Sequence, residues 1–83
     1  MFQIKITQKA KKALNKLPDK IQLKIVEQVD KLHLNPRPKT AKKLTNQEGY
    51  RIRVSEWRLL YITDKKRKII TIVRIAHRRE VYR

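Results

Sequence analysis

The start of the chain alternates apolar and polar residues and then changes to helical spacing. Residues 2–6 read Phe-Gln-Ile-Lys-Ile, and this period of two is typical of a half-buried strand. Thr7 is a suitable N-cap for a following helix, because its hydroxyl can accept a hydrogen bond from a free amide of the first turn. The Pro-Asp pair at 18–19 ends that helix and begins another, which continues to the Asn-Pro pair at 35–36.

The apolar positions of both predicted helices fall on one side of each helix. They are Ala10, Ala13, Leu14 and Leu17 in the first helix, and Ile21, Ile25, Val26, Val29 and Leu32 in the second. We therefore expect two antiparallel amphipathic helices with a tight connection. His33 lies at the edge of the second stripe, and we expect it to be a half-buried structural residue.

A period of two returns after Gly49, the only glycine of the chain. The three predicted strands cover residues 50–54, 57–63 and 69–76, with turns at 55–56 and 64–68 and a lysine-containing surface connection over 35–48. The order β-α-α-β-β-β predicts an α+β fold, a small and mainly antiparallel sheet covered on one face by two antiparallel helices. At 83 residues, the chain is expected to form a single domain over 1–83.

The charge of the chain narrows the classes of partner. Lysine and arginine number 23 against 7 acidic residues, which gives a net charge of +16. Such an excess attracts polyanions, so nucleic acid or an acidic protein is the expected partner. The basic residues are spread along the chain, and no segment pairs a basic face with an aromatic one. This argues against binding to a membrane surface. No apolar run reaches the roughly 20 residues that span a bilayer, so we expect a cytoplasmic protein.

Several kinds of chemistry are excluded by composition. The chain has no cysteine, so it has no disulfide, thiolate nucleophile or cysteine-ligated zinc site. Two histidines and seven acidic residues are too few to indicate a metal site, and we expect neither a metal nor a cofactor.

Arginines gather on one face of the predicted hairpin. If residues 55–56 form a two-residue loop, Val54 lies opposite Trp57 and Arg53 lies opposite Arg58. The side chains Tyr50, Ile52, Val54, Trp57, Leu59 and Tyr61 then share the face that the helices cover, and Arg51, Arg53 and Arg58 project from the other. Like charges across a ladder are destabilising. The arginines are either merely solvated or form a preformed site for a phosphodiester, which guanidinium groups bind bidentately.

Other basic segments allow the same two interpretations. The run 77–83 reads His-Arg-Arg-Glu-Val-Tyr-Arg, which is either a solvated tail or an RNA contact in which Tyr82 stacks on a base. Lys39, Lys42 and Lys43 are candidates for phosphate contacts in the connection. The face taken by Arg74 stays open, since a shift of one residue in the pairing around 64–68 would move it to the other side.

Taken together, three segments of the chain resemble a known family. They are Gly-Tyr-Arg-Ile-Arg-Val at 49–54, Trp-Arg-Leu-Leu-Tyr at 57–61 and Ile-Ala-His-Arg-Arg-Glu-Val-Tyr at 75–82, with Lys-Leu at 43–44 before them. They resemble the RelE/ParE superfamily of toxins of type II toxin–antitoxin systems. The resemblance implies a ribosome-dependent endoribonuclease that cuts mRNA in the ribosomal A site. It also implies a cognate acidic antitoxin, through which the complex would bind operator DNA and repress its own operon.

The resemblance also implies roles for individual residues. Arg51 and Arg53 match two basic strand positions beside the scissile phosphate, where the best-known members have lysines. Arg58 matches the arginine that holds the phosphate and the transition state, and Arg78 matches the one assigned to leaving-group stabilisation. Tyr82 matches the tyrosine that stacks on or orients the substrate nucleotide. The remaining RNA-binding candidates are Lys39, Lys42, Lys43, Arg74, Arg79 and Arg83.

Two departures from the family pattern affect the expected mechanism. Guanidinium groups do not lose a proton in proteins, so Arg51 and Arg53 cannot act as a general base. His77 could replace them as the general base, or it is a packed and non-catalytic residue. Ala76 stands where glycine is common in the family.

Two other functions remain open at this point. A ParE-like toxin would use the same fold to inhibit DNA gyrase without catalysis, although that branch generally lacks the full basic and tyrosine set. A basic RNA-binding or ribosome-associated protein would share the charge and have no nuclease activity.

Overall fold

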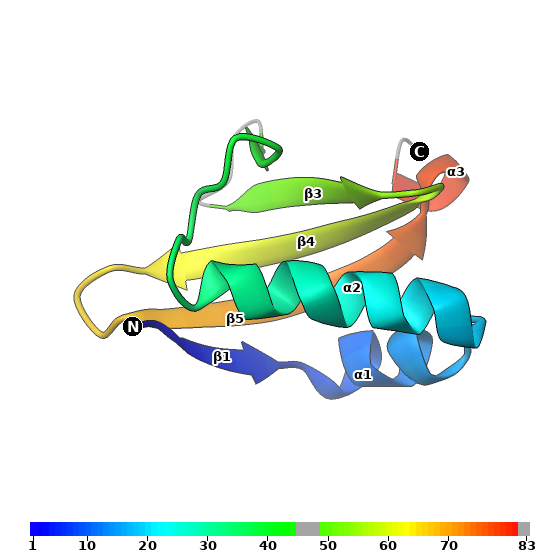
Figure 1. Cartoon of the computed structure of the whole chain (residues 1–83), viewed down its shortest axis with the longest axis horizontal. Helices are drawn as coiled ribbons and strands as arrows, with labels where there is room; N and C mark the ends of the chain where they lie inside the picture. The colour runs from blue at the N-terminus through cyan, green and yellow to red at the C-terminus, as the bar shows by residue number, and fades with distance from the viewer. Residues whose placement is uncertain (45–48, 82–83) are drawn as a thin grey trace.

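The computed structural model of the chain describes residues 1–44 and 49–81. Figure 1 shows its elements, which follow one another as β1 (Gln3–Ile6), α1 (Gln8–Asn15), α2 (Asp19–Leu32), β2 (Lys42–Lys43), β3 (Tyr50–Val54), β4 (Trp57–Asp64), β5 (Ile69–His77) and α3 (Arg78–Val81). The strands form one sheet in the order β1-β5-β4-β3-β2. Only the β1–β5 pair is parallel among these neighbours.

The predicted α+β fold is confirmed, and the structure adds two short elements to it. Strand β2 lies within the segment expected to be a plain connection, and it pairs with β3 through Lys42 opposite Arg51 and Lys43 opposite Tyr50. Two lysines carry no apolar period, so pattern analysis had no signal for this strand. Lysines at a sheet edge also discourage pairing with another chain. The other addition is α3, a single turn of helix after β5.

Local contacts explain where the two long helices begin and end. Thr7 is the N-cap of α1 as expected, and its Oγ1 accepts a hydrogen bond from the Ala10 amide at 3.2 Å. The tight connection is held by Gln22, whose Nε2 donates to the Leu17 carbonyl at 2.8 Å. Beyond α2, Nδ1 of His33 lies 2.7 Å from the Phe2 carbonyl oxygen, which supports the structural role predicted for this histidine.

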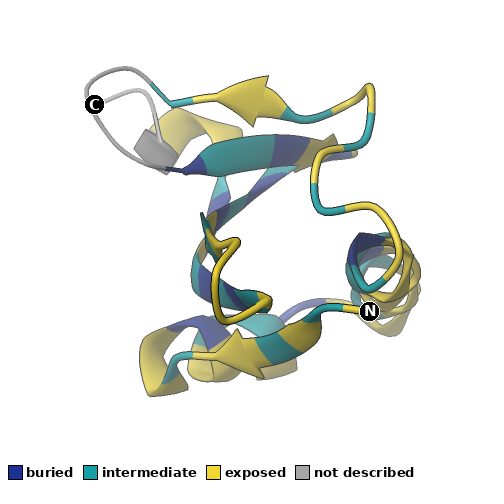
Figure 2. Ribbon diagram, turned by 90° about the vertical axis from the view of Figure 1, so that its left-hand side faces the viewer, coloured by how far each residue is buried: buried dark blue, intermediate teal, exposed yellow. Residues whose placement is uncertain are grey.

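Both helices pack on the same face of the sheet and enclose one apolar core. Its buried members are Ala10, Leu17, Ile25, Leu32, Ile52, Val54, Leu59, Tyr61, Ile70, Ile72 and Ile75, with Tyr50 and Trp57 packed against them. Figure 2 shows that the sides of the helices that face away from the sheet are exposed. Val26, expected on the apolar face of α2, is 45% exposed and lies at the margin of the core. Neither of the two long helices lies over the opposite face of the sheet, which we call the uncovered face, although Arg58 and Ala76 on that face are buried.

A β-bulge in β5 decides which side chains reach that uncovered face. Leu60 of β4 pairs with Arg74, but its neighbour Tyr61 pairs with Ile72, so Val73 is an extra residue on β5. Since side chains alternate along a strand, the extra residue exchanges the two faces for the rest of β5. Arg74 consequently lies on the uncovered face with Leu60, and Ile75 is buried in the core at 4% exposure.

Thr7 anchors the bulge as well as the helix. Its amide donates to the Ile72 carbonyl at 3.0 Å, and its Oγ1 lies 3.4 Å from the carbonyl oxygen of Val73, to which it donates. One residue at the end of β1 therefore holds both the start of α1 and the irregular part of β5.

Tyr61 connects the core to the segment before β2. Its ring is fully buried, and its hydroxyl donates to the Pro36 carbonyl at 2.9 Å. Burial raises the pKa of Tyr61 to about 12, and the nearby Tyr50 hydroxyl adds to the rise. Gly49 lies close by, and a Cβ at this position would come within 2.8 Å of the Tyr61 carbonyl oxygen. The only glycine is therefore required by a close approach of two strands.

We expect the free energy of unfolding to depend on the ionisation of Tyr61. An unfolded tyrosine ionises near pH 10, whereas the folded group ionises near pH 12. The contribution is therefore complete below pH 10 and is lost as the pH rises toward 12, by roughly 2–3 kcal/mol over this window. Urea unfolding of the wild type and Tyr61→Phe from pH 8 to 12 measures the loss.

The substitution also isolates this effect from all other titrations. Lysines and the remaining tyrosines ionise in both proteins, so only the difference between them reports Tyr61. At pH 8 we expect Tyr61→Phe to be less stable by about 1 kcal/mol, because the hydrogen bond to Pro36 is missing. The difference should vanish or reverse by pH 12. A difference that stays constant with pH would contradict this account.

Candidate nucleic-acid site on the uncovered sheet face

The β3–β4 hairpin has the predicted register. Val54 lies opposite Trp57, and Arg53 lies opposite Arg58. The turn contains Ser55 with φ 58°, in the left-handed region that favours glycine. The Ser55 carbonyl oxygen accepts a hydrogen bond from Nε of Arg53 at 3.2 Å, so the turn helps to hold this guanidinium group.

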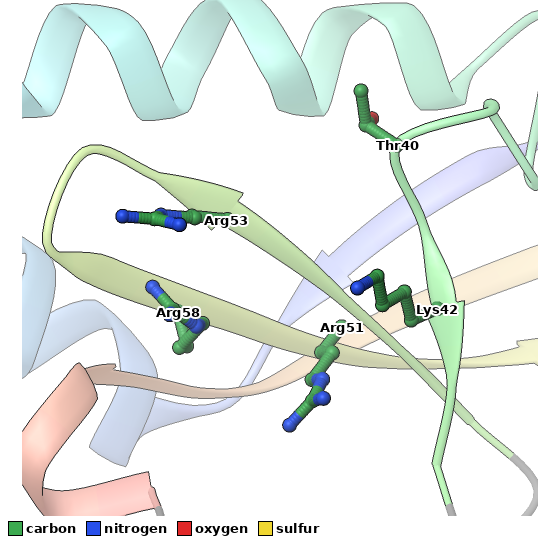
Figure 3. A pocket seen from close by; sticks show the side chains of 5 residues that line it. All are labelled: Thr40, Lys42, Arg51, Arg53 and Arg58. Carbon is green, nitrogen blue, oxygen red and sulfur yellow. The ribbon is translucent and has the colours of Figure 1, made fainter.

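A basic hollow lies on the uncovered face of the sheet, over β2, β3 and β4. We call its lining side chains the arginine cluster, defined as Arg51, Arg53, Arg58, Lys42 and Thr40. Figure 3 shows Arg53 and Arg58 extending from neighbouring strands and Lys42 extending from β2 toward β3. Arg53 and Arg58 are cross-strand neighbours, whose Cβ atoms lie about 4.5–5.5 Å apart, and Arg51 is two residues, or about 7 Å, along β3 from Arg53.

The members of the cluster differ in how far they are fixed by the protein. Arg58 is only 7% exposed, and its Nη1 donates to the Trp57 carbonyl at 3.3 Å. The residue opposite on β5 is Ala76, a small side chain that is itself buried. Arg51 is half-buried, and Arg53 is exposed. The cluster thus combines one inward-held guanidinium with others that reach solvent.

The structure separates the three lysines predicted to contact phosphate. Lys42 pairs with Arg51 and lines the cluster. Lys43 pairs with Tyr50 and lines another hollow, while Lys39 is exposed and does not line the cluster. Thr40 was missed by sequence analysis, because a lone threonine in a connection has no pattern that distinguishes it. Its position depends on how the segment after α2 returns to the sheet.

The structure does not place His77 among the residues that line the arginine cluster. Arg58 pairs with Ala76, so the next residue of β5 turns to the helix side, where it pairs with Trp57. The two rings are 5.3 Å apart in an edge-to-face arrangement. Nε2 of His77 is 3.3 Å from a Glu56 carboxylate oxygen, and Nδ1 lies 3.4 Å from the Arg79 amide, which donates to it.

The remaining candidates lie around the end of β5. Arg74 is exposed on the uncovered face, next to Leu60. Arg78 begins α3, and its amide donates to the Glu56 carbonyl at 2.8 Å, while the side chains of Arg78 and Arg79 are exposed. Tyr82 and Arg83 lie outside the described residues. Within the described ranges, no group of three or more histidine, aspartate and glutamate side chains could hold a metal ion.

Comparison with known families identifies the chain. The family model described as ParE toxin of type II toxin-antitoxin system, parDE, matches residues 4–82. The chain belongs to the RelE/ParE superfamily of type II toxins. The resemblance of segments 49–54, 57–61 and 75–82 to this superfamily is thereby confirmed, and the arginine cluster is a feature of a toxin.

Solved structures support the same assignment. The toxin is similar to the archaeal RelE–RelB complex from Pyrococcus horikoshii OT3, with 28% identity over 93% of this chain and 94% of that chain and a TM-score of 0.81. It is similar to the toxin–antitoxin complex RelBE2 from Mycobacterium tuberculosis, with 28% identity, 92% and 96% coverage and a TM-score of 0.80. Both relatives were solved with an antitoxin.

A more distant structure shares the fold. The isolated RelE toxin of E. coli covers 99% of this chain and 92% of its own, with 20% identity and a TM-score of 0.83. No curated protein matches the toxin. In the part of the toxin that the structure describes, no helix has the length and apolar content needed to cross a membrane.

We expect the arginine cluster to reduce the stability of the free toxin. Replacing Arg53 by glutamine removes one of two like charges that face each other across the ladder. In low salt, the free energy of unfolding should rise by about 0.2–1 kcal/mol, and the gain should shrink as ionic strength increases. Urea unfolding at several salt concentrations measures both effects.

The matched control is Lys24→Gln, which removes an exposed charge of the same sign from α2. It reports how much stability follows from lower net charge alone. Equal gains in the two variants would show that the repulsion is not specific to the cluster.

Proposed function

We propose that the toxin is a RelE-type endoribonuclease that cuts mRNA in the ribosomal A site in the cytoplasm. The observation that carries this proposal is the grouping of Arg51, Arg53 and Arg58 on the uncovered sheet face. Guanidinium forks match the oxygens of a phosphodiester in geometry and charge.

The arginine cluster can provide what RNA cleavage requires. RNA carries its own nucleophile, since the 2′-hydroxyl can attack the adjacent phosphorus. A bond from the 2′ oxygen to phosphorus forms and the bond to the 5′ oxygen breaks, which leaves a 2′,3′-cyclic phosphate and a 5′-hydroxyl. Arg58, whose Nη1 donates to the Trp57 carbonyl, would stabilise the charge of the phosphorane. Arg51 and Arg53 would hold the phosphate so that attacking and leaving oxygens are in line.

Proton transfer has to follow another route. Guanidinium groups stay charged in proteins, so the three arginines supply alignment and charge but no general base. His77 lies on the opposite side of β5, against Trp57. In the proposed mechanism the 2′-hydroxyl releases its proton to solvent, and the 5′ oxygen takes one from solvent. Tyr82 would stack on the substrate base, and Arg78 would support the leaving group.

The net charge of the toxin and the complexes formed by related toxins indicate the partners of the proposed activity. The ribosome and mRNA are polyanions that suit a chain of net charge +16. Related toxins were solved with RelB antitoxins, and we propose a cognate acidic antitoxin for this toxin as well. Such a chain would neutralise the basic surface, and operator DNA would be bound only through the complex.

A ParE-like activity is the second candidate, because the matching family model carries the ParE description. In that case the toxin would inhibit DNA gyrase without cutting RNA. The two candidates differ in their target, so one experiment on each target separates them.

The proposed nuclease should lose activity when the cluster loses one guanidinium. On programmed ribosomes, the wild type should produce transcript ends inside the A-site codon. We expect Arg53→Gln to lower the cleavage rate about 100-fold, because a misplacement of the reacting oxygens by about 1 Å can cost this much. Primer extension and single-turnover kinetics measure this loss. Lys24→Gln, on α2, should cleave at the wild-type rate.

Other results would contradict the nuclease. Intact transcripts together with inhibition of gyrase supercoiling by the purified toxin would support the ParE branch. Equal cleavage by the wild type and Arg53→Gln would show that the arginine cluster is not the site.

The absence of an imidazole base from the cluster predicts a particular pH profile. Cleavage should accelerate steadily from pH 6 to 8, because solvent takes the proton of the 2′-hydroxyl. His77→Gln should keep the same profile and a rate within about threefold of the wild type. Single-turnover rates across this range test both statements. A wild-type rate that levels off above about pH 7, where imidazole is neutral, and a flattened His77→Gln profile would restore a catalytic histidine.

A further inference from the structure

Four residues form a continuous row across the uncovered face of the sheet. Lys42 lies opposite Arg51, Arg51 lies opposite Leu60, and Leu60 lies opposite Arg74. We call Lys42, Arg51, Leu60 and Arg74 the cross-strand row. It runs perpendicular to strands β2, β3, β4 and β5, and it passes directly beside the Arg53–Arg58 pair. Its order is basic, basic, apolar, basic.

The spacing of the row follows from the sheet. Neighbouring strands are about 4.8 Å apart, so the Cα atoms of Arg51 and Arg74 are separated by about 10 Å and the full row spans about 14 Å. Arg74 is exposed, and Leu60 between the two arginines is half-buried. Arg74 is thus a second cationic point on the same face, set apart from the arginine cluster by one apolar side chain.

The bulge at Val73 gives Arg74 this position. If Val73 took a regular place in the ladder opposite Leu60, Arg74 would be two residues after Ile72 and would lie on the core side of β5. The bulge is held by two hydrogen bonds from Thr7, so the orientation of Arg74 is built into the fold and is not a chance conformation of a long side chain.

We propose that the cross-strand row is a second nucleotide subsite, in which Arg74 binds the phosphate next to the scissile one and Leu60 contacts the nucleoside between them. This inference rests on the proposed function, since it takes the scissile phosphate to lie at the arginine cluster. A single strand would then cross the sheet along the row. Apolar and guanidinium surfaces suit the faces of a sugar and a base, and a single-stranded segment exposes both.

The subsite can be tested with two short ligands that cannot be cut. A 2′-O-methyl dinucleotide has one phosphodiester, and the corresponding trinucleotide has two. The full toxin should bind the trinucleotide about two- to fivefold more tightly, as expected for one additional exposed ion pair. NMR titration in low salt measures both dissociation constants.

Arg74→Gln should abolish this gain and leave binding of the dinucleotide unchanged. The salt dependence of trinucleotide binding should also weaken, with the slope of log K against log salt falling by about 0.7, the value for one phosphate contact on a single strand. Lys24→Gln removes an equal charge from α2 and should retain the gain. Arg74→Lys, which keeps the charge, should recover part of it.

The outcomes separate this inference from the proposed function. If Arg53→Gln weakens the dinucleotide while Arg74→Gln retains the full gain for the trinucleotide, the arginine cluster stands and the second subsite is overturned. If neither variant changes binding of either ligand, both proposals fail.

A peptide Glu-Ala-Glu with blocked ends carries the same charge as the trinucleotide. Equal affinity and equal dependence on Arg74 for this peptide would show a surface for acidic protein, which also overturns the subsite.

Discussion

Two helices bury one face of a five-stranded sheet, and this one-sided burial is the constraint on which the other features of the toxin depend. The apolar side chains of β3, β4 and β5 have to face α1 and α2, because together they form the single core of a small chain. Strict alternation then assigns the intervening residues to the opposite face. In β3 and β4 those residues include Arg51, Arg53 and Arg58. The position of the basic site is therefore a consequence of how the core is made.

The architecture was predictable from sequence because it follows from strong periodic patterns. The alternation of residues 50–54 and the two-residue turn were sufficient to predict the register of the β3–β4 hairpin, and with it the opposition of Arg53 and Arg58. The structural roles of His33 and Trp57 followed from their positions on apolar stripes. Each of these predictions depended on neighbours within a few residues along the chain.

The parts that could not be predicted depend on contacts between distant segments. Strand β2 exists because Lys42 and Lys43 meet the free edge of β3, and nothing in their own sequence indicates a strand. The positions of Arg74 and His77 depend on the bulge at Val73, which forms where Thr7, 66 residues earlier, binds its carbonyl oxygen. A strand pattern read without that bulge assigns the end of β5 to the wrong faces. The sequence left open whether His77 is a general base or a packed residue, and the structure places its ring against Trp57.

The bulge lets β5 carry one residue more than its partner strand without changing the faces of the residues that follow it. Loss of Val73 would leave Arg74 directly after Ile72 and still opposite Leu60, with Ile75 still facing the core. If Val73 instead entered the ladder opposite Leu60, every later side chain of the strand would turn over, which would draw Arg74 inward and present Ile75 to solvent. The backbone path and the order of strands could then stay the same while the chemistry of the exposed face was exchanged.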